Sequence, residues 1–197
     1  KKTFEDIEAG TYKIVETNSA IEGYRFEEEQ SVTEAETTVS KDEAGAAEII
    51  DAYTELGNLE ITKTVTGGIT KEEAEGALKF EITTTVTVVD EETGEETEVT
   101  KWLDKDGKLS DKKVEITIAD FDEDTFEYDE EGNLTSAKKT FEDIEAGTYK
   151  IVETNTAIEG YSFIADASVT EAETTVSKDE GGAATIEDVY TEIGGLT

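Results

Sequence analysis

One decapeptide occurs twice in this chain, and any fold assigned to the chain must accommodate both copies. AGTYKIVETN occupies Ala9–Asn18 and again Ala146–Asn155. Each copy lies inside a longer shared run, because residues 1–57 match residues 138–194 at all but eleven positions. The period is therefore 137 residues, an ordinary size for a single domain. The sequence predicts a tandem array built from one domain type.

The repeat divides the chain into three parts. Residues 1–57 are expected to be the C-terminal part of a preceding unit, and residues 58–194 a complete unit. Residues 195–197 are expected to begin the next unit. The predicted linker Leu56–Asn58 is very short, which suits a stacked rod better than loosely tethered domains.

Composition excludes several function classes. The chain holds 51 acidic and 17 basic residues, a net charge of −34, so its field repels nucleic acid and anionic membranes. No apolar run is long enough to span a bilayer, and no membrane insertion is expected. Cys and His are absent, which excludes disulfides, thiolate metal sites and the usual His-containing triads. We expect no cofactor and no metal.

Apolar and polar residues alternate over many short segments bounded by turn residues, the pattern of an all-β sandwich or barrel. In the partial unit the expected strands are Thr3–Ile7, Thr11–Glu16, Tyr24–Phe26, Ser31–Thr38 and Glu48–Thr54. In the complete unit they are Leu59–Val65, Leu78–Val89, Thr97–Trp102, Val114–Ile118, Thr125–Tyr128, Thr140–Ile144, Thr148–Glu153, Tyr161–Ile164, Ser168–Thr175 and Thr185–Thr191. A helical turn is expected at Lys71–Glu75, and a hairpin turn at Glu91–Glu96.

Three ionisable residues fall in apolar rows of predicted strands, on the first, a middle and the last strand of the complete unit: Lys63, Glu153 and Asp188. Buried charges are costly unless paired. Burial favours the neutral form of both an amine and a carboxyl group. A neutral amine beside a neutral carboxylic acid, with a second carboxyl to move protons, is equipped for acyl transfer to nitrogen. The product would be a Lys–Asp isopeptide bond and one water; a plain buried ion pair is the alternative.

Four motifs resemble the CnaB-type (Cna protein B-type) domains of Gram-positive surface proteins and pilins. They are LEITKTV at Leu59–Val65, GTYKIVET at Gly147–Thr154, EGY at Glu159–Tyr161 and EDVYT at Glu187–Thr191. In the partial unit, IIDAY at Ile49–Tyr53 is similar to the Asp-bearing strand of such domains. The resemblance implies an Ig-like or prealbumin-like β-sandwich in which the first and last strands are neighbours.

The resemblance also implies a role for each of the three residues. Lys63 would be the nucleophile, Asp188 the acceptor and Glu153 the proton-shuttling catalyst. Glu16 and Asp51 match the last two roles in the partial unit, whose lysine strand would lie before Lys1. Many relatives use Asn as the acceptor, whereas this chain has Asp.

A tandem array of cross-linked domains predicts a structural role. We expect a stalk or shaft repeat of an extracellular, cell-wall or fibre-associated bacterial adhesin or pilus-like fibre. Its partners would be neighbouring identical repeats and other copies of the chain. The self-acylation is a single turnover, so the chain is not a conventional enzyme.

Three alternatives remain open at this level. The first is a ligand-binding adhesin domain, whose site would lie in residues 76–137. The second is a filament in which the lysine half of one chain completes residues 1–57 of another. The third is an acidic cation-binding repeat, since Asp104–Gly107 and Asp129–Asn133 faintly resemble calcium loops, although hairpin turns are the better interpretation of both. Trp102 alone does not make a sugar-binding platform.

Overall fold

The computed structural model describes residues 1–90 and 93–194, and it divides into two compact units, residues 1–55 and residues 56–197. The predicted start of a further repeat, residues 195–197, lies outside the described residues, as does part of the turn Glu91–Glu96.

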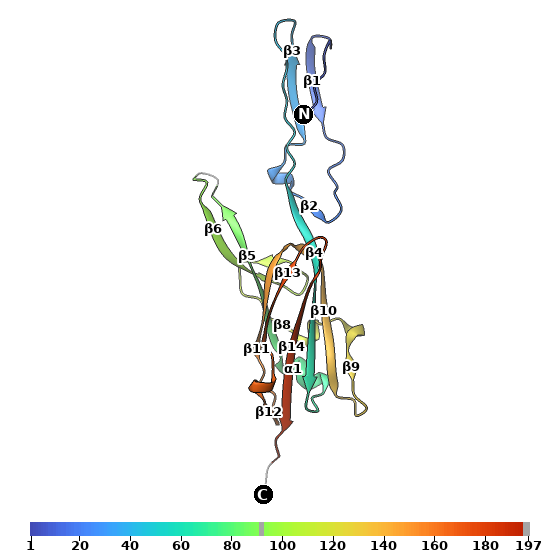
Figure 1. The fold of residues 1–197 in the computed structure, drawn as a ribbon, viewed down its shortest axis with the longest axis vertical. Coiled ribbons are helices and arrows are strands. Elements are labelled where there is room, and N and C mark those ends of the chain that lie inside the picture. Colours follow the sequence, from blue (N-terminus) through green and yellow to red (C-terminus); the bar gives the residue numbers. More distant parts are fainter. Residues whose placement is uncertain (91–92, 195–197) are drawn as a thin grey trace. The chain divides into compact units, whose positions relative to one another are not determined.

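Residues 56–194 contain two β-sheets (Figure 1). The first has the strand order β12-β14-β4-β10-β9. Its strands are β4 (Tyr53–Thr66), β9 (Glu127–Tyr128), β10 (Leu134–Glu145), β12 (Tyr161–Phe163) and β14 (Gly182–Glu192). The second has the order β13-β11-β5-β6-β7, with β8 also paired to β5. Its strands are β5 (Lys79–Val89), β6 (Glu96–Leu103), β7 (Leu109–Ser110), β8 (Ile116–Thr117), β11 (Gly147–Asn155) and β13 (Glu171–Val176).

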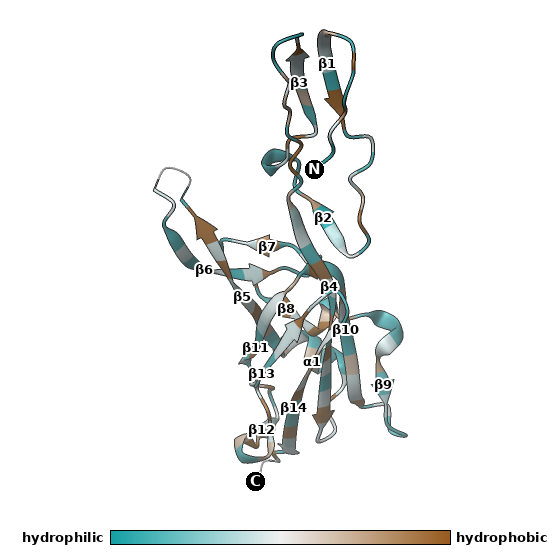
Figure 2. Ribbon diagram, turned by 45° about the horizontal axis from the view of Figure 1, so that its top comes forward, coloured by the Kyte–Doolittle hydropathy of each residue, from teal (hydrophilic) through white to brown (hydrophobic). Residues whose placement is uncertain are grey.

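The core lies between these sheets, because each contributes an apolar row to it. Bands of hydrophobic and hydrophilic residues alternate along β14 in Figure 2, and its burial alternates in step. The buried residues of both sheets form one cluster, with Leu59, Phe80, Ile151 and Ile186 among its members. This arrangement confirms the predicted all-β sandwich.

The first and last strands of the complete unit are direct neighbours. β4 and β14 pair in parallel over eight residues, from Leu59 opposite Gly182 to Thr66 opposite Val189. Parallel pairing requires a long connection between two strands, and here the whole second sheet lies within it. Two segments far apart in sequence are thus joined at the centre of the first sheet.

Short helices connect the strands. α1 (Lys71–Ala77) contains the predicted helical turn and starts with a capping box, in which Thr70 and Glu73 satisfy each other's backbone N–H groups. The remaining helical turns are of the 3-10 type and are η1 (Glu28–Gln30), η2 (Ile118–Asp120), η3 (Glu123–Thr125) and η4 (Ala165–Ala167). The predicted strand Val114–Ile118 is shorter than expected, because Asp120 caps Thr117 and turns the chain into η2.

In residues 1–55, β1 (Gly10–Val15) pairs antiparallel with β3 (Glu34–Val39), and β2 (Tyr24–Phe26) pairs with Tyr53–Glu55. The predicted strand Thr3–Ile7 is wrong, and so is most of Glu48–Thr54. Their counterparts in the second copy lie in β10 and β14, and both of those strands pair with β4. A strand persists only when a partner accepts its backbone hydrogen bonds, so the same sequence is irregular where that partner is lacking.

The predicted linker Leu56–Asn58 is also wrong. These three residues lie inside β4, which continues without a break from Tyr53 to Thr66. Gly57 permits this continuity, since a Cβ added there would lie 2.3 Å from the carbonyl oxygen of Ser177. The close approach of two backbones therefore selects glycine at a position where the turn propensity of Gly-Asn predicted a loop.

Candidate functional site

The structure brings Lys63, Glu153 and Asp188 together inside the sandwich. Lys63 Nζ lies 2.7 Å from Asp188 Oδ1 and 2.9 Å from Glu153 Oε2. All three side chains have no exposed surface. Residues separated by 90 and 125 positions in the sequence thus form one contact cluster, here named the amine–carboxyl cluster.

The two sheets supply opposite sides of this cluster. Lys63 and Asp188 lie on the paired strands β4 and β14, where Lys63 is opposite Ile186, two residues before Asp188. Because side chains alternate along a strand, Asp188 and Ile186 share the inward face. Glu153 comes from β11 of the second sheet, opposite Phe80 of β5. The lysine therefore reaches one carboxyl within its own sheet and a second across the core.

The end of β4 is held close to β14 by a glycine. Gly67 has a φ of +124°, and a Cβ added there would lie 2.4 Å from the carbonyl oxygen of Tyr190. Only glycine combines this backbone conformation with such a close approach. Gly67 thus lets the chain turn away immediately after the lysine strand without separating β4 from β14.

Burial dominates the protonation of Glu153. It raises the pKa of Glu153 to about 8; the Lys63 ammonium opposes this rise, and the neighbouring Asp188 carboxyl adds to it. With Glu153 protonated, an ammonium on Lys63 and a carboxylate on Asp188 give the cluster no net charge. Moving one proton from Lys63 to Asp188 leaves a neutral amine beside a neutral acid, again with no net charge. Both arrangements avoid an uncompensated charge in the core.

Two oxygens of the cluster are left without hydrogen bonds among the described residues. They are Glu153 Oε1 and Asp188 Oδ1, both buried. The Lys63 ammonium donates to Glu153 Oε2 but approaches Asp188 Oδ1 outside hydrogen-bond geometry, although the two atoms are only 2.7 Å apart. Unsatisfied buried polar atoms are costly. A proton on Glu153 removes this cost, because the Glu153 side chain then hydrogen-bonds to Asp188.

Two aromatic residues complete the surroundings of the cluster. Lys63 Nζ lies 5.7 Å from the centre of the Phe80 ring. The hydroxyl group of Tyr190 lies 3.0 Å from Asp188 Oδ2 and donates to the carbonyl oxygen of Thr156 at 2.8 Å. Tyr190 is not among the site residues predicted from the sequence. Its spacing of two from Asp188, which places both on one face of a strand, was the available signal.

The partial unit contains a related pair of carboxyl groups, Glu16 and Asp51. Burial, followed by the Asp51 carboxyl, raises the pKa of Glu16. Glu16 Oε2 is buried, and a side-chain hydrogen bond joins the Glu16 and Asp51 carboxyl groups. The two carboxyls that the sequence singled out are thus neighbours in this copy too, and the amine comes only with the second copy.

The two acidic loops are turns. Asp104 Oδ1 accepts from the backbone N–H groups of Asp106 and Lys108. Asp129 Oδ1 accepts from those of Glu131 and Asn133. Backbone donors thus already occupy the oxygens that a cation would need, and the turn interpretation is confirmed. In residues 1–90 and 93–194, no group of three or more acidic side chains is arranged to hold a metal ion.

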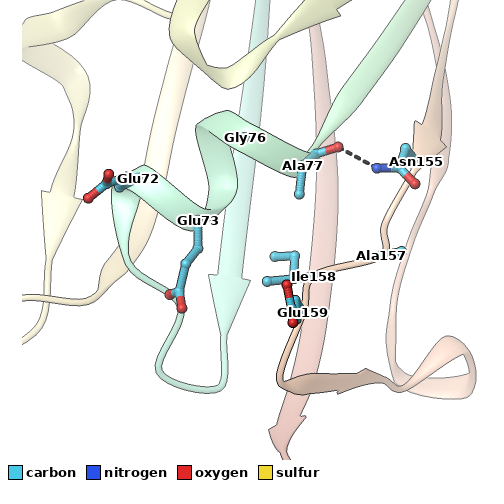
Figure 3. Close-up of a pocket in the computed structure, with 8 residues that line it drawn as sticks. All are labelled: Glu72, Glu73, Gly76, Ala77, Asn155, Ala157, Ile158 and Glu159. Atoms are coloured by element: carbon cyan, nitrogen blue, oxygen red, sulfur yellow. Dashed lines mark hydrogen bonds between the residues drawn. The ribbon is translucent and has the colours of Figure 1, made fainter.

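An open hollow is lined by residues other than those of the amine–carboxyl cluster (Figure 3). It is formed by α1 and the segment after β11, and its lining residues are Glu72, Glu73, Gly76, Ala77, Asn155, Ala157, Ile158 and Glu159. The Asn155 side chain donates to the carbonyl oxygen of Ala77 across it, and the Glu73 carboxylate is engaged in capping α1. These polar groups serve the fold, so the hollow is not the candidate site.

Within the part of the chain that is described, no helix is long and apolar enough to cross a membrane.

Comparisons with known proteins give structural matches only. No family model matches the chain, and no curated protein matches it in sequence. It is similar to a point mutant of the shaft pilin spaA from Lactobacillus rhamnosus GG, with 15% identity and a TM-score of 0.34 over 95% of this chain and 64% of that one. It is also similar to a streptococcal ancillary pilin, with 18% identity and a TM-score of 0.32 over 93% of this chain and 42% of that one.

A further match is a mutant of the major pilin from Streptococcus pyogenes, with 14% identity and a TM-score of 0.31, covering 98% of this chain and 73% of that one. The chain thus spans less than two thirds of the length of the first two of these proteins. The function proposed below is inferred from the geometry of Lys63, Glu153 and Asp188.

Proposed function

We propose that residues 56–194 form a CnaB-type domain that joins Lys63 to Asp188 by an autocatalytic isopeptide bond, and that the chain is a stalk repeat of an extracellular bacterial adhesin or pilus-like fibre. One observation carries the proposal: a fully buried lysine amine lies 2.7 Å from an aspartate carboxyl and 2.9 Å from a second carboxyl. The free-energy cost of burying these ionisable groups is offset if the product is a neutral amide.

The reaction follows from the positions of the atoms. The neutral amine of Lys63 attacks Cγ of Asp188, and a bond forms between Nζ and Cγ. Glu153, a neutral acid at the start, gives its own proton to the departing hydroxyl of Asp188 and takes one from the amine through Oε2, which accepts a hydrogen bond from Nζ. The bond from Cγ to that hydroxyl breaks, and one water leaves. Glu153 ends the cycle in its starting protonation state, so it acts as a catalyst.

The position of the bond supports a structural role. β4 and β14 are the first and last strands of residues 56–194, and a bond between Lys63 and Asp188 closes a loop of 125 residues. Tension along the chain then passes from β4 directly into β14 through a covalent bond. The second sheet, which lies within the closed loop, is not loaded. A repeat built in this way keeps its length under tension, as a stalk requires.

The first experiment is the intact mass of the denatured protein beside a Lys63→Ala control. We expect a mass one water below the sequence value, and no deficit in the control. Peptide mapping should then find Lys63 linked to Asp188. A wild-type mass equal to the sequence value would mean that the cluster is an ion pair, and the stalk proposal would lose its chemical basis.

A second candidate is the filament in which another chain completes residues 1–55. It is favoured by the neighbouring carboxyls Glu16 and Asp51 and by apolar side chains of that unit that stay exposed. Phe4 is 67% exposed, whereas its counterpart Phe141 is 3% exposed. If this candidate is right, wild type should give SDS-resistant ladders, and an Asp51→Ala variant should not. A single band for both wild type and the variant would confine the cross-link to residues 56–194.

A further inference from the structure

Tyr190 makes two polar contacts with one hydroxyl group. Its oxygen lies 2.8 Å from the carbonyl oxygen of Thr156 and 3.0 Å from Oδ2 of Asp188. Its side chain is 4% exposed, and this burial raises the pKa of Tyr190, so the phenol keeps its proton. A phenol has one proton and therefore donates one hydrogen bond. Only one of the two neighbouring oxygens can accept it.

The two copies of the repeat identify the acceptor. Tyr53 is the counterpart of Tyr190 in residues 1–55, and its hydroxyl donates to the carbonyl oxygen of Ser19 at 2.8 Å. Ser19 is the counterpart of Thr156. The bond from tyrosine to the backbone thus forms in a copy that has no lysine strand, which makes it a property of the fold. A carbonyl oxygen can only accept, so the proton of Tyr190 is committed to Thr156.

In the contact between Tyr190 and Asp188, the carboxyl group must then be the donor of the hydrogen bond. If Oδ2 of Asp188 carries a proton, it donates to the Tyr190 oxygen at 3.0 Å and both contacts are satisfied. If Oδ2 is an unprotonated carboxylate oxygen, two acceptor oxygens face each other in the core at the same distance, which is unfavourable.

We infer that Tyr190 is a positioning residue for isopeptide formation: it accepts a hydrogen bond from protonated Oδ2 of Asp188 and so fixes Oδ2 as the leaving hydroxyl. This inference rests on the proposed function. Oδ1, the oxygen near Lys63 Nζ, becomes the carbonyl oxygen of the amide. The bond from Nζ to Cγ forms and the bond from Cγ to Oδ2 breaks. The proton that Glu153 gives up completes the departing water, and a proton from the amine replaces it on Glu153. Tyr190 neither gains nor loses a proton overall.

The test compares two variants that each delete one buried phenol hydroxyl, Tyr190→Phe and Tyr149→Phe. Tyr149 is also buried, and its hydroxyl donates to a backbone carbonyl, that of Glu145, at 2.7 Å. The control therefore loses the same kind of hydrogen bond away from Asp188. Chains made by cell-free synthesis are quenched in denaturant at successive times, and the loss of one water is followed by intact mass. The folded fraction is measured on the same variants with Glu153→Gln added.

We expect Tyr190→Phe to form the bond roughly tenfold more slowly per folded chain, the effect of losing one buried hydrogen bond, and Tyr149→Phe to match wild type. The dependence of the rate on pH should also change in Tyr190→Phe and stay as in wild type in Tyr149→Phe, because only Tyr190 contacts the reacting carboxyl group. Equal rates in both variants, an unchanged pH profile in Tyr190→Phe, or a failure of only Tyr190→Phe to fold would overturn the inference. A wild-type chain that loses no water would instead refute the proposed function.

Discussion

Replacing Glu153 by Gln is expected to leave the sandwich intact but without its cross-link. Glutamine has the shape of glutamate, and its amide oxygen can still accept the hydrogen bond from Lys63. It cannot carry a proton from the amine to the departing hydroxyl. The Lys63 ammonium and the Asp188 carboxylate remain as a neutral pair, so the main loss is the constraint on the unfolded chain.

That loss can be estimated from the position of the bond. A cross-link that closes 125 residues lowers the entropy of the unfolded chain by an amount worth about 5 kcal/mol. For a unit of this size, unfolding entropy of about 2.1 cal/mol/K per residue converts this to a fall in melting temperature of about 15 °C. We expect this fall in calorimetry of Glu153→Gln, together with a mass equal to its sequence value.

Glu171→Gln is the matched control. Glu171 lies on β13, is 58% exposed and pairs with Lys150 at 2.9 Å. Exposed pairs contribute about 1 kcal/mol or less, so this variant should keep both the water loss and nearly all of the melting temperature. A Glu153→Gln chain that still loses water would remove Glu153 from the mechanism. A chain that lacks the bond but melts with wild type would refute the loop-closure estimate.

Three other measurements test the same picture. Lys63→Met cannot cross-link, and in this variant burial still raises the pKa of the Glu153 carboxyl from 4.5 towards 8. The folded state therefore binds a proton that the unfolded state has lost, so the urea midpoint should fall as pH rises from about 4.5 to about 8. Adding Glu153→Gln should remove this fall. In single-molecule pulling, Glu153→Gln should release about 40 nm more contour than wild type, since 125 further residues extend by about 3.4 Å each; equal lengths would place no bond between β4 and β14. Calcium should leave the melting temperature unchanged, whereas Asp129→Ala, which removes three hydrogen bonds within its turn, should lower stability by about 1 kcal/mol; stabilisation by calcium would restore the cation-binding alternative.

The site was predictable because strand alternation is a strict geometric rule. A period of two places Lys63, Glu153 and Asp188 in apolar rows, and the structure buries all three. Their mutual distances did not follow from alternation, since these depend on the parallel register of β4 and β14 and on the packing of two sheets. Tyr190 was missed for a related reason: its apolar ring accounts for its position, and its second role depends on where one proton goes.

The errors at Thr3–Ile7 and Leu56–Asn58 come from strand pairing. Thr3–Ile7 and Thr140–Ile144 have the same sequence, yet only the second belongs to a strand, β10. The difference is the partner strand β4, which a local pattern cannot reveal. Leu56–Asn58 shows the opposite case, in which tertiary pairing extends a strand through a glycine that local propensity would place in a turn.

The complete burial of the cluster also bears on the equilibrium of the proposed bond. In bulk water an amide competes with a vast excess of the very molecule that hydrolyses it. At Lys63 and Asp188 the side chains have no exposed surface, and apolar core residues such as Phe80 and Ile186 surround them. Formation of the amide removes the charges of Lys63 and Asp188, so the expelled water loses its strongest hydrogen-bond partners and leaves for bulk solvent. The interior thus favours amide formation over amide hydrolysis, and the proposed bond, once formed, is kept from the water that would hydrolyse it.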